Sequence, residues 1–160
     1  MLHKSLNIPC SNKKMAGILY SSTQDSFKTR CPLTKQVKKV LSKEGYSILN
    51  ESVYPYFPNF ACLEHQLLSQ KPVAVVLDLT SPDIVTDPTK FCDYITEKAW
   101  KLYGKRAPPI IVITDTVTRG AQAMLGGAYN YVSTEYDCIN TLVDRVNEAV
   151  LAIRPELQVA

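Results

Sequence analysis

The sequence predicts a single α/β domain, because short apolar runs alternate along the chain with segments of helical periodicity. A length of 160 residues fits one core of ordinary size, and 46% hydrophobic with 21% charged residues is typical of a globular domain. The apolar runs are nearly continuous, as in strands that are buried on both faces of a parallel sheet. They cover residues 16–20, 46–49, 73–77, 110–113 and 129–132.

Helical patterns follow each of these runs. The first begins at Pro32, which suits a first helical turn, and ends before Gly45, the residue type that favours a helix C-terminus. Asp87 ahead of Pro88 predicts the N-cap of another helix, and Asp137 predicts the N-cap of the last one. The remaining helices are expected over 59–70 and 117–125, and Gly126-Gly127 is the expected C-cap of the latter.

Five β-α units in about 140 residues predict a doubly wound parallel sheet with helices on both faces. The expected architecture is flavodoxin-like, with strand order 2-1-3-4-5. In that order a crevice forms at the carboxyl ends of strands one and three, where Ser21, Ser22 and Asp78 fall. We expect a domain over residues 15–153, with an N-terminal extension over 1–14 and a C-terminal tail over 154–160.

Composition excludes several classes of protein. No apolar run approaches the roughly 18 residues of a membrane span, so we expect a soluble, cytoplasmic protein without a membrane partner. The five cysteines are odd in number and form no Cys-x-x-Cys pair, which argues against a disulfide framework and a zinc site. Residues 1–44 hold nine Lys/Arg against two acids, but without aromatic interleaving or a binding motif we expect no nucleic-acid partner.

Three stretches resemble the receiver domain of bacterial two-component response regulators. Residues 75–83 (VVLDLTSPD) are similar to its third strand and phosphoacceptor loop, and residues 109–114 (PIIVIT) to its fourth strand. Residues 123–132 (AMLGGAYNYV) are similar to the stretch that leads into its fifth strand. The resemblance makes Asp78 the phosphoacceptor equivalent, and Thr114 and Tyr131 the switch residues.

The sequence differs from the receiver family that it resembles at two places. Ser21 and Ser22 stand where the family has the acidic pair that holds magnesium, and hydroxyls supply oxygen atoms without the charge that this ion needs. Thr134 stands where the family has a lysine followed by a cis-proline, and Glu135 beside it would repel a phosphoryl group. We therefore expect no metal ion and no other cofactor.

Asp78 and Thr114 also have structural uses, because an aspartate at a strand end accepts loop amides and a threonine bonds a neighbouring carbonyl. The leading hypothesis is thus a pseudo-receiver: a signalling module that binds proteins without magnesium-dependent aspartyl phosphorylation, and not an enzyme. The expected partner is a histidine kinase or a downstream signalling protein. It would dock on the face that includes residues 117–124 and 140–148, with the first helix, residues 32–44, as a second face.

Two alternatives stay open. In the first, a histidine kinase phosphorylates Asp78, and Asp25 or Asp83 helps to hold a magnesium ion. In the second, the chain binds a small ligand at the crevice where the strand order reverses. No glycine-rich phosphate loop follows the first strand, and Ser21 and Ser22 have no evident base beside them.

Overall fold

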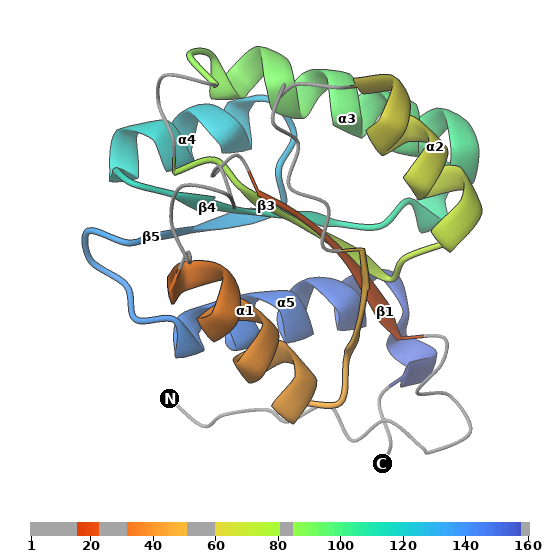
Figure 1. Ribbon diagram of the computed structural model, residues 1–160. Helices are drawn as coiled ribbons and strands as arrows, with labels where there is room; N and C mark the ends of the chain where they lie inside the picture. The colour runs from red at the N-terminus through yellow and green to blue at the C-terminus, as the bar shows by residue number, and fades with distance from the viewer. Residues whose placement is uncertain (1–15, 23–31, 51–59, 81–84, 158–160) are drawn as a thin grey trace.

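The computed structural model describes residues 16–22, 32–50, 60–80 and 85–157. These residues form a five-stranded parallel sheet of order β2-β1-β3-β4-β5, which confirms the predicted flavodoxin-like fold (Figure 1). The strands are β1 (Gly17–Ser22), β2 (Ser47–Asn50), β3 (Ala74–Asp78), β4 (Ile110–Thr114) and β5 (Asn130–Ser133). The helices are α1 (Pro32–Lys43), α2 (Phe60–Gln70), α3 (Pro88–Tyr103), α4 (Val117–Leu125) and α5 (Asn140–Ile153), with short 3-10 turns η2 (Gly104–Arg106) and η3 (Pro155–Leu157).

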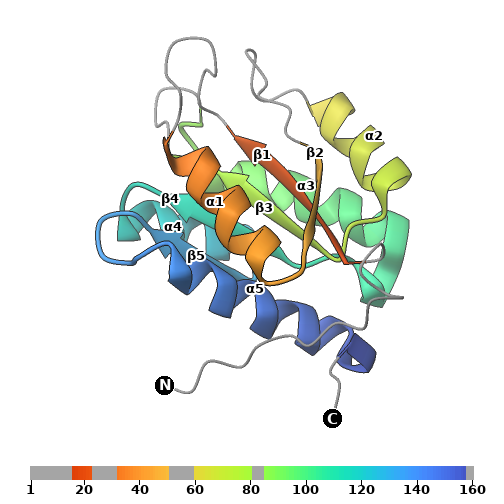
Figure 2. The same ribbon diagram turned by 60° about the horizontal axis from the view of Figure 1, so that its bottom comes forward.

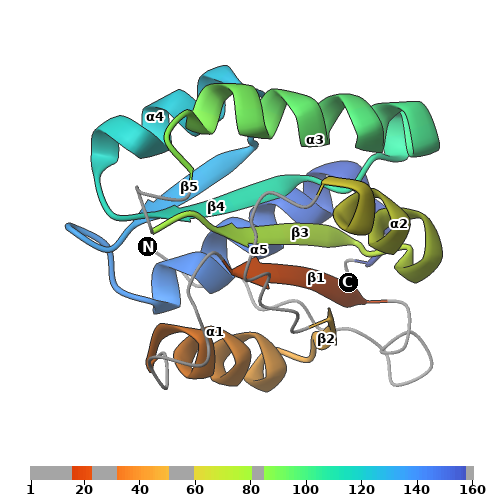
Figure 3. The same cartoon turned by 45° about the horizontal axis from the view of Figure 1, so that its top comes forward.

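The sheet is the middle of three layers. Helices α1 and α5 cover one face, and α2, α3 and α4 cover the other (Figures 1, 2 and 3). Each face has its own apolar core: Ile18, Val76 and Val146 belong to the α1/α5 side, and Leu77, Ile95 and Val112 to the other. The two cores hold the strands in place, so the strand ends on which the candidate site lies are fixed by packing on both sides.

Every strand except β4 begins one residue later than its apolar run, and every strand ends one residue later except β1, which ends two residues later. The reason is that the ladder continues through the polar residue after each run: Ser22 pairs with Asp78, and Thr114 pairs with Ser133. Apolar runs report burial, whereas a strand lasts as long as its backbone hydrogen bonds. The polar ends of the strands are therefore part of the rigid sheet.

The predicted helix ends are confirmed except one. Asp87 caps α3 by accepting a hydrogen bond from the Lys90 amide at 3.1 Å, and Gly45 ends α1 with a positive φ of 104°. The prediction that Asp137 caps α5 is wrong, because α5 begins at Asn140. The Asp137 carboxylate instead accepts the Ser133 amide at 2.9 Å and so belongs to the preceding turn.

In the described part of the chain, no helix is both long and apolar enough to span a bilayer. The packed unit extends past α5, because Leu157 in η3 is buried against the α1/α5 core. The expected extension over residues 1–14, and residues 158–160 of the expected tail, lie outside the described residues.

Candidate functional site

The polar strand ends meet at one edge of the sheet, as the sequence predicts. Register pairs Ser22 of β1 with Asp78 of β3, and Asp78 with Ile113 of β4. Thr114 follows at the end of β4 and pairs with Ser133 of β5. The residues that the sequence predicts for the site therefore lie at the ends of neighbouring strands.

Asp78 is the central residue of this edge, and it is fully buried, with 0% of its surface exposed. Its Oδ1 atom accepts two hydrogen bonds from Thr80, one from the backbone amide at 3.0 Å and one from the hydroxyl at 2.6 Å. The carboxylate thus fastens the first residues after β3. This is the structural use that an aspartate at a strand end was expected to have.

The end of β1 carries neutral groups. Ser21 is buried, and its Oγ atom forms no hydrogen bond with any of the residues that the structure describes. Such a buried hydroxyl without a partner costs free energy, which makes it a feature of interest. Asp25 and Asp83, the acids that could complete a magnesium site, lie outside the described residues.

The end of β5 is closed by a tight turn in place of the family's lysine and cis-proline. Ser133 and Asp137 bond each other twice: the Asp137 amide donates to the Ser133 carbonyl at 2.8 Å, and the Asp137 carboxylate accepts from the Ser133 amide. The Thr134 amide donates to the Thr114 carbonyl at 2.9 Å, while the Thr134 side chain is exposed. Glu135, also exposed, is the charged residue next to this position.

Thr114, the switch equivalent, is fully buried and is used at the entry to α4. Its hydroxyl donates to the Thr116 carbonyl at 2.8 Å. The Thr116 hydroxyl in turn caps α4 by accepting the Arg119 amide at 3.2 Å. The end of β4 and the first turn of α4 are therefore one hydrogen-bonded unit.

Arg119 connects this unit to the segment after Asp78, and sequence reasoning missed it. One guanidinium nitrogen, Nη2, donates to the Leu79 carbonyl at 3.1 Å and to the Val85 carbonyl at 2.7 Å. The Nε atom lies 3.0 Å from Asp115 Oδ1 as an ion pair, although the two do not align as a hydrogen bond. The Arg119 side chain is only 12% exposed. A fixed cation thus ties both ends of the β3–α3 connection to α4.

Tyr131, the second switch equivalent, packs directly on α4. A Cβ atom at Gly120 would overlap the Tyr131 ring, so the ring occupies the space that the glycine leaves free. Tyr131 is half-buried and belongs to the edge of the α2/α3/α4 core. Gly120 therefore has a packing role: the absence of a side chain at this position leaves room for Tyr131, the aromatic residue of β5.

Helix α4 carries an unusual exposed face. Its large apolar side chains Val117, Met124 and Leu125 are exposed, with Leu125 at 81%, and Ala121 lies between them at helical spacing. Most single exposed apolar residues need no explanation, but a row of them along one helix is typical of an interaction surface. We call these four residues the α4 apolar row.

The receiver fold implies a magnesium ion, and the residues described here do not fit one. The described strand ends contribute one carboxylate, Asp78, among the neutral hydroxyls of Ser21, Thr80 and Thr114. Among the residues that the structure describes, no cluster of three or more acids, histidines or cysteines could hold a metal ion. Magnesium dehydrates reluctantly and needs carboxylate charge, so this donor set is a poor match.

Comparison with solved structures identifies the fold. The structural neighbours include receiver domains of response regulators and of a sensor histidine kinase, and this chain has their fold. Sequence comparison finds no matching protein family and no similar curated protein.

Three neighbours illustrate the range. The receiver domain of a putative LuxO repressor protein from Vibrio parahaemolyticus is 17% identical, with a TM-score of 0.60 over 88% of this chain and 94% of that one. The receiver domain of the histidine kinase PA1611 from Pseudomonas aeruginosa, with magnesium in its cleft, is 16% identical, with a TM-score of 0.56 over 84% and 97%. An atypical orphan response regulator with a phosphorylation-independent regulatory mechanism is 18% identical, with a TM-score of 0.56 over 84% and 94%.

Proposed function

We propose that this protein is a pseudo-receiver, a protein-interaction module of signal transduction that works without magnesium-dependent phosphorylation of Asp78. The proposal rests on the residues that stand at the site. Asp78 is buried and accepts hydrogen bonds from Thr80. Serines and a threonine stand where the receiver family has its acidic pair and its lysine. The proposal includes that the chain has no enzymatic activity and needs no cofactor.

Electrostatics supports this interpretation. Transfer of a phosphoryl group to a carboxylate depends on cations that neutralise the transferred charge, because the protein itself contributes little covalent chemistry. At the end of β5 the exposed Thr134 hydroxyl supplies no charge, and Glu135 supplies the wrong sign. The Arg119 guanidinium is a fixed cation that binds the segment after Asp78, and it is already bonded to two main-chain carbonyls.

The Arg119 contacts also replace a function that a phosphoryl group would otherwise have. In a conditional switch, an added charge reorganises the loops around the site and the helix that follows. Here permanent hydrogen bonds already join the segment after Asp78 to α4, and the Tyr131 ring is seated on Gly120. We infer that α4 is held in one arrangement whether or not Asp78 is modified.

The docking surface that we propose is the α4–β5–α5 face, centred on the α4 apolar row. Helix α4 packs against β5, the edge strand, and α5 lies on the other side of that strand (Figure 1). On α5 the exposed positions one turn apart are Asn140, Asp144 and Glu148, two of them acidic. A partner with an apolar patch and basic residues next to it fits this surface.

The first test is a titration of the protein with magnesium, then with beryllofluoride or a small phosphodonor, followed by amide-resolved NMR and intact mass. We expect amide shifts around Ser21, Asp78 and Thr114 to stay unchanged and the mass to show no added phosphoryl group. Local shifts together with a mass gain that Asp78→Ala abolishes would overturn the proposal and make the chain a phosphoacceptor.

The second test addresses the docking face. We expect Leu125→Ser to remove specific partners in affinity capture with quantitative mass spectrometry. The matched control is Leu68→Ser, since Leu68 is an exposed leucine on α2. Equal loss with both variants would count against the α4–β5–α5 face as the docking surface.

A further inference from the structure

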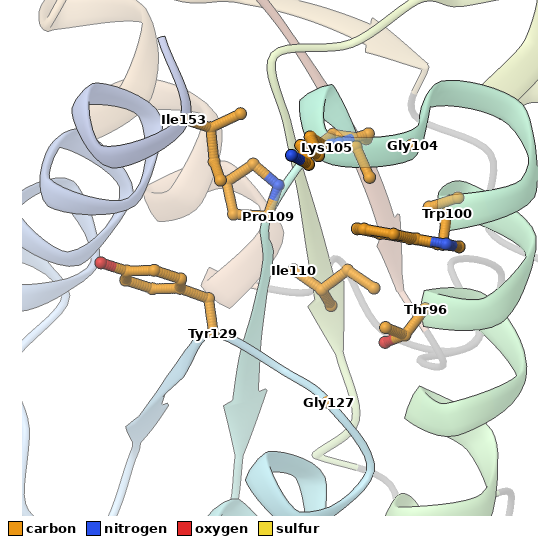
Figure 4. A pocket seen from close by; sticks show the side chains of 12 residues that line it. Thr96, Trp100, Gly104, Lys105, Pro109, Ile110, Gly127, Tyr129 and Ile153 are labelled. Atoms are coloured by element: carbon orange, nitrogen blue, oxygen red, sulfur yellow. The ribbon is translucent and has the colours of Figure 1, made fainter. Parts of the chain in front are cut away.

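A cavity lies at the opposite end of the molecule from Asp78. Its walls come from the C-terminal half of α3, from η2, from the start of β4 and from the α4–β5 connection. The side chains that give it its character are Thr96, Trp100, Lys105, Pro109, Ile110 and Tyr129. In Figure 4 the rings of Trp100 and Tyr129 flank Ile110, and Lys105 lies above it. Neither the phosphoacceptor-equivalent site nor the α4 apolar row shares a residue with this cavity.

The cavity is built on rigid elements. Pro109 and Ile110 are buried at the start of β4, an interior strand of the sheet. Gly127 has a positive φ of 103°, and a Cβ atom there would lie 2.9 Å from the Thr96 hydroxyl, so α3 and the α4–β5 turn are in close contact. A preformed cavity costs a ligand little reorganisation, which favours binding of small molecules.

Aromatic surface is unusually available at this position. Trp100 is 59% exposed and Tyr129 is 38% exposed, although both are large enough to be buried with profit. The cavity measures about 190 Å³. Apolar cavities of roughly 150 Å³ in other proteins hold a benzene molecule, so one ring fits here.

Among the described charged residues around the cavity, one positive charge has no acidic partner. Glu97, the single carboxylate in the C-terminal half of α3, is paired with Lys101 at 2.9 Å, and this pairing lowers the pKa of Glu97. Glu156 is paired with Arg106. Within the described parts of the chain, Lys105 has no carboxylate partner, and it is exposed. A flexible ammonium group at the edge of an aromatic cavity complements a carboxylate.

We propose that this cavity is a binding site for a small planar aromatic carboxylate, with the ring between Trp100 and Ile110 and the acid group on Lys105. The ring gains apolar and stacking contacts in the cavity, and the carboxylate pairs with Lys105, which has no carboxylate partner among the described residues. This site is separate from the crevice at the strand ends, and the inference does not depend on the proposed function.

The chain contains one tryptophan, Trp100, so fluorescence excited at 295 nm reports directly on the cavity. The probes are sodium benzoate and benzamide, which share shape and differ in charge. For a ligand of nine heavy atoms we expect a dissociation constant for benzoate on the order of 1 mM. Benzamide should bind roughly two- to fivefold more weakly, the factor typical of an exposed ion pair. In amide-resolved NMR, benzoate should shift Gly127 and Ile110 first.

Two variants separate the contributions. Lys105→Gln should reduce the affinity for benzoate to that for benzamide, and Lys101→Gln, which removes a lysine that is also exposed but is paired with Glu97, should leave the preference for benzoate intact. Three results overturn the inference: no saturable change up to 20 times the expected dissociation constant, shifts that cluster elsewhere, or equal binding of the two probes that Lys105→Gln does not alter.

Discussion

The contact between Gly120 and Tyr131 makes a prediction about the sign of a stability change. Glycine in a helix interior normally destabilises a protein by about 1 kcal/mol relative to alanine, so Gly120→Ala would usually stabilise. Here the added Cβ atom would overlap the Tyr131 ring, including Cγ, the ring atom closest to the Tyr131 backbone. Rotation of the ring about its own axis cannot relieve a clash at that atom. The whole side chain, or α4, must move.

The magnitude follows from two opposing terms. Carbon atoms in contact normally lie about 3.5–4.0 Å apart, so the ring must shift by roughly 1 Å or more. Overpacking of this kind costs about 1–3 kcal/mol, and we expect the upper half of that range because Gly120 is buried. After subtraction of the helix-propensity gain, Gly120→Ala should lower the free energy of unfolding by about 1–2 kcal/mol. The melting temperature should fall by about 3–8 °C.

Urea unfolding followed by circular dichroism measures this change, and two further variants calibrate it. Ala121→Gly, at an exposed position of the same helix, should cost about 1 kcal/mol and gives the propensity term alone. In a Tyr131→Val background the ring is gone, so Gly120→Ala should now stabilise by about 1 kcal/mol. The double-mutant cycle should then give a coupling energy of about 2–3 kcal/mol.

The reasoning fails if Gly120→Ala stabilises the protein equally in the presence and absence of the Tyr131 ring. A coupling energy near zero would mean that Tyr131 does not rest on Gly120 in solution. The contact that holds Tyr131 against α4 would then not exist. The inference that α4 is held in one arrangement would rest on the Arg119 hydrogen bonds alone.

Three further predictions concern other parts of the molecule. Arg119→Met should lower the free energy of unfolding by about 1–3 kcal/mol in urea unfolding, because two main-chain carbonyls lose a charged donor at a largely buried position. Cys138 should react with a thiol reagent in the folded protein long before Cys92, and mass spectrometry can map the modified residue. A hydrogen bond from Thr141 lowers the pKa of Cys138, whereas burial raises the pKa of Cys92 to about 12. Burial raises the pKa of Tyr46 well above its ordinary value of 10.0, so the folded state keeps a proton that the unfolded state loses. The contribution of Tyr46 to stability should therefore be constant below pH 10 and fall above it by about 1.4 kcal/mol per pH unit, and Tyr46→Phe should make the alkaline fall in stability shallower.

Much of this architecture was predictable from sequence because burial and helix ends leave local signals. Continuous apolar runs identified all the strands, and Asp87 and Gly45 marked helix ends where the structure has them. The convergence of Ser22 and Asp78 at one edge followed from the geometry of parallel strands, whereas Thr114 was singled out by the resemblance to receiver domains. Asp137 misled because an aspartate near a helix can serve a turn as well as a cap, and the choice depends on which amide lies closer.

The interactions that distinguish this site were not predictable in the same way. Arg119 lies 34 and 40 residues from the carbonyls that it binds, and a long side chain on an expected helix is normally solvated. The match between Gly120 and Tyr131 is likewise a contact between two elements, and the sequence marks the glycine only as a weak helix former. The cavity beside Trp100 requires that α3, β4 and the α4–β5 turn be placed together before its shape exists.

The hydrogen bonds of Arg119 also affect whether phosphorylation of Asp78 could move α4, which is the point on which the pseudo-receiver and phosphoacceptor hypotheses differ. For phosphorylation to move α4, the new charge must favour a second arrangement by more than the contacts that hold the first. Those contacts include the Arg119 bonds to two carbonyls, worth together several kcal/mol at a largely buried position. They also include the seating of Tyr131 on Gly120. A phosphoryl group that had neither a magnesium ion nor a lysine to bind would supply little of that difference, because its own charge would be uncompensated.

We therefore expect partner binding on the α4–β5–α5 face to be the same for the wild-type protein, for Asp78→Ala and in the presence of a phosphodonor. Arg119→Met should change it.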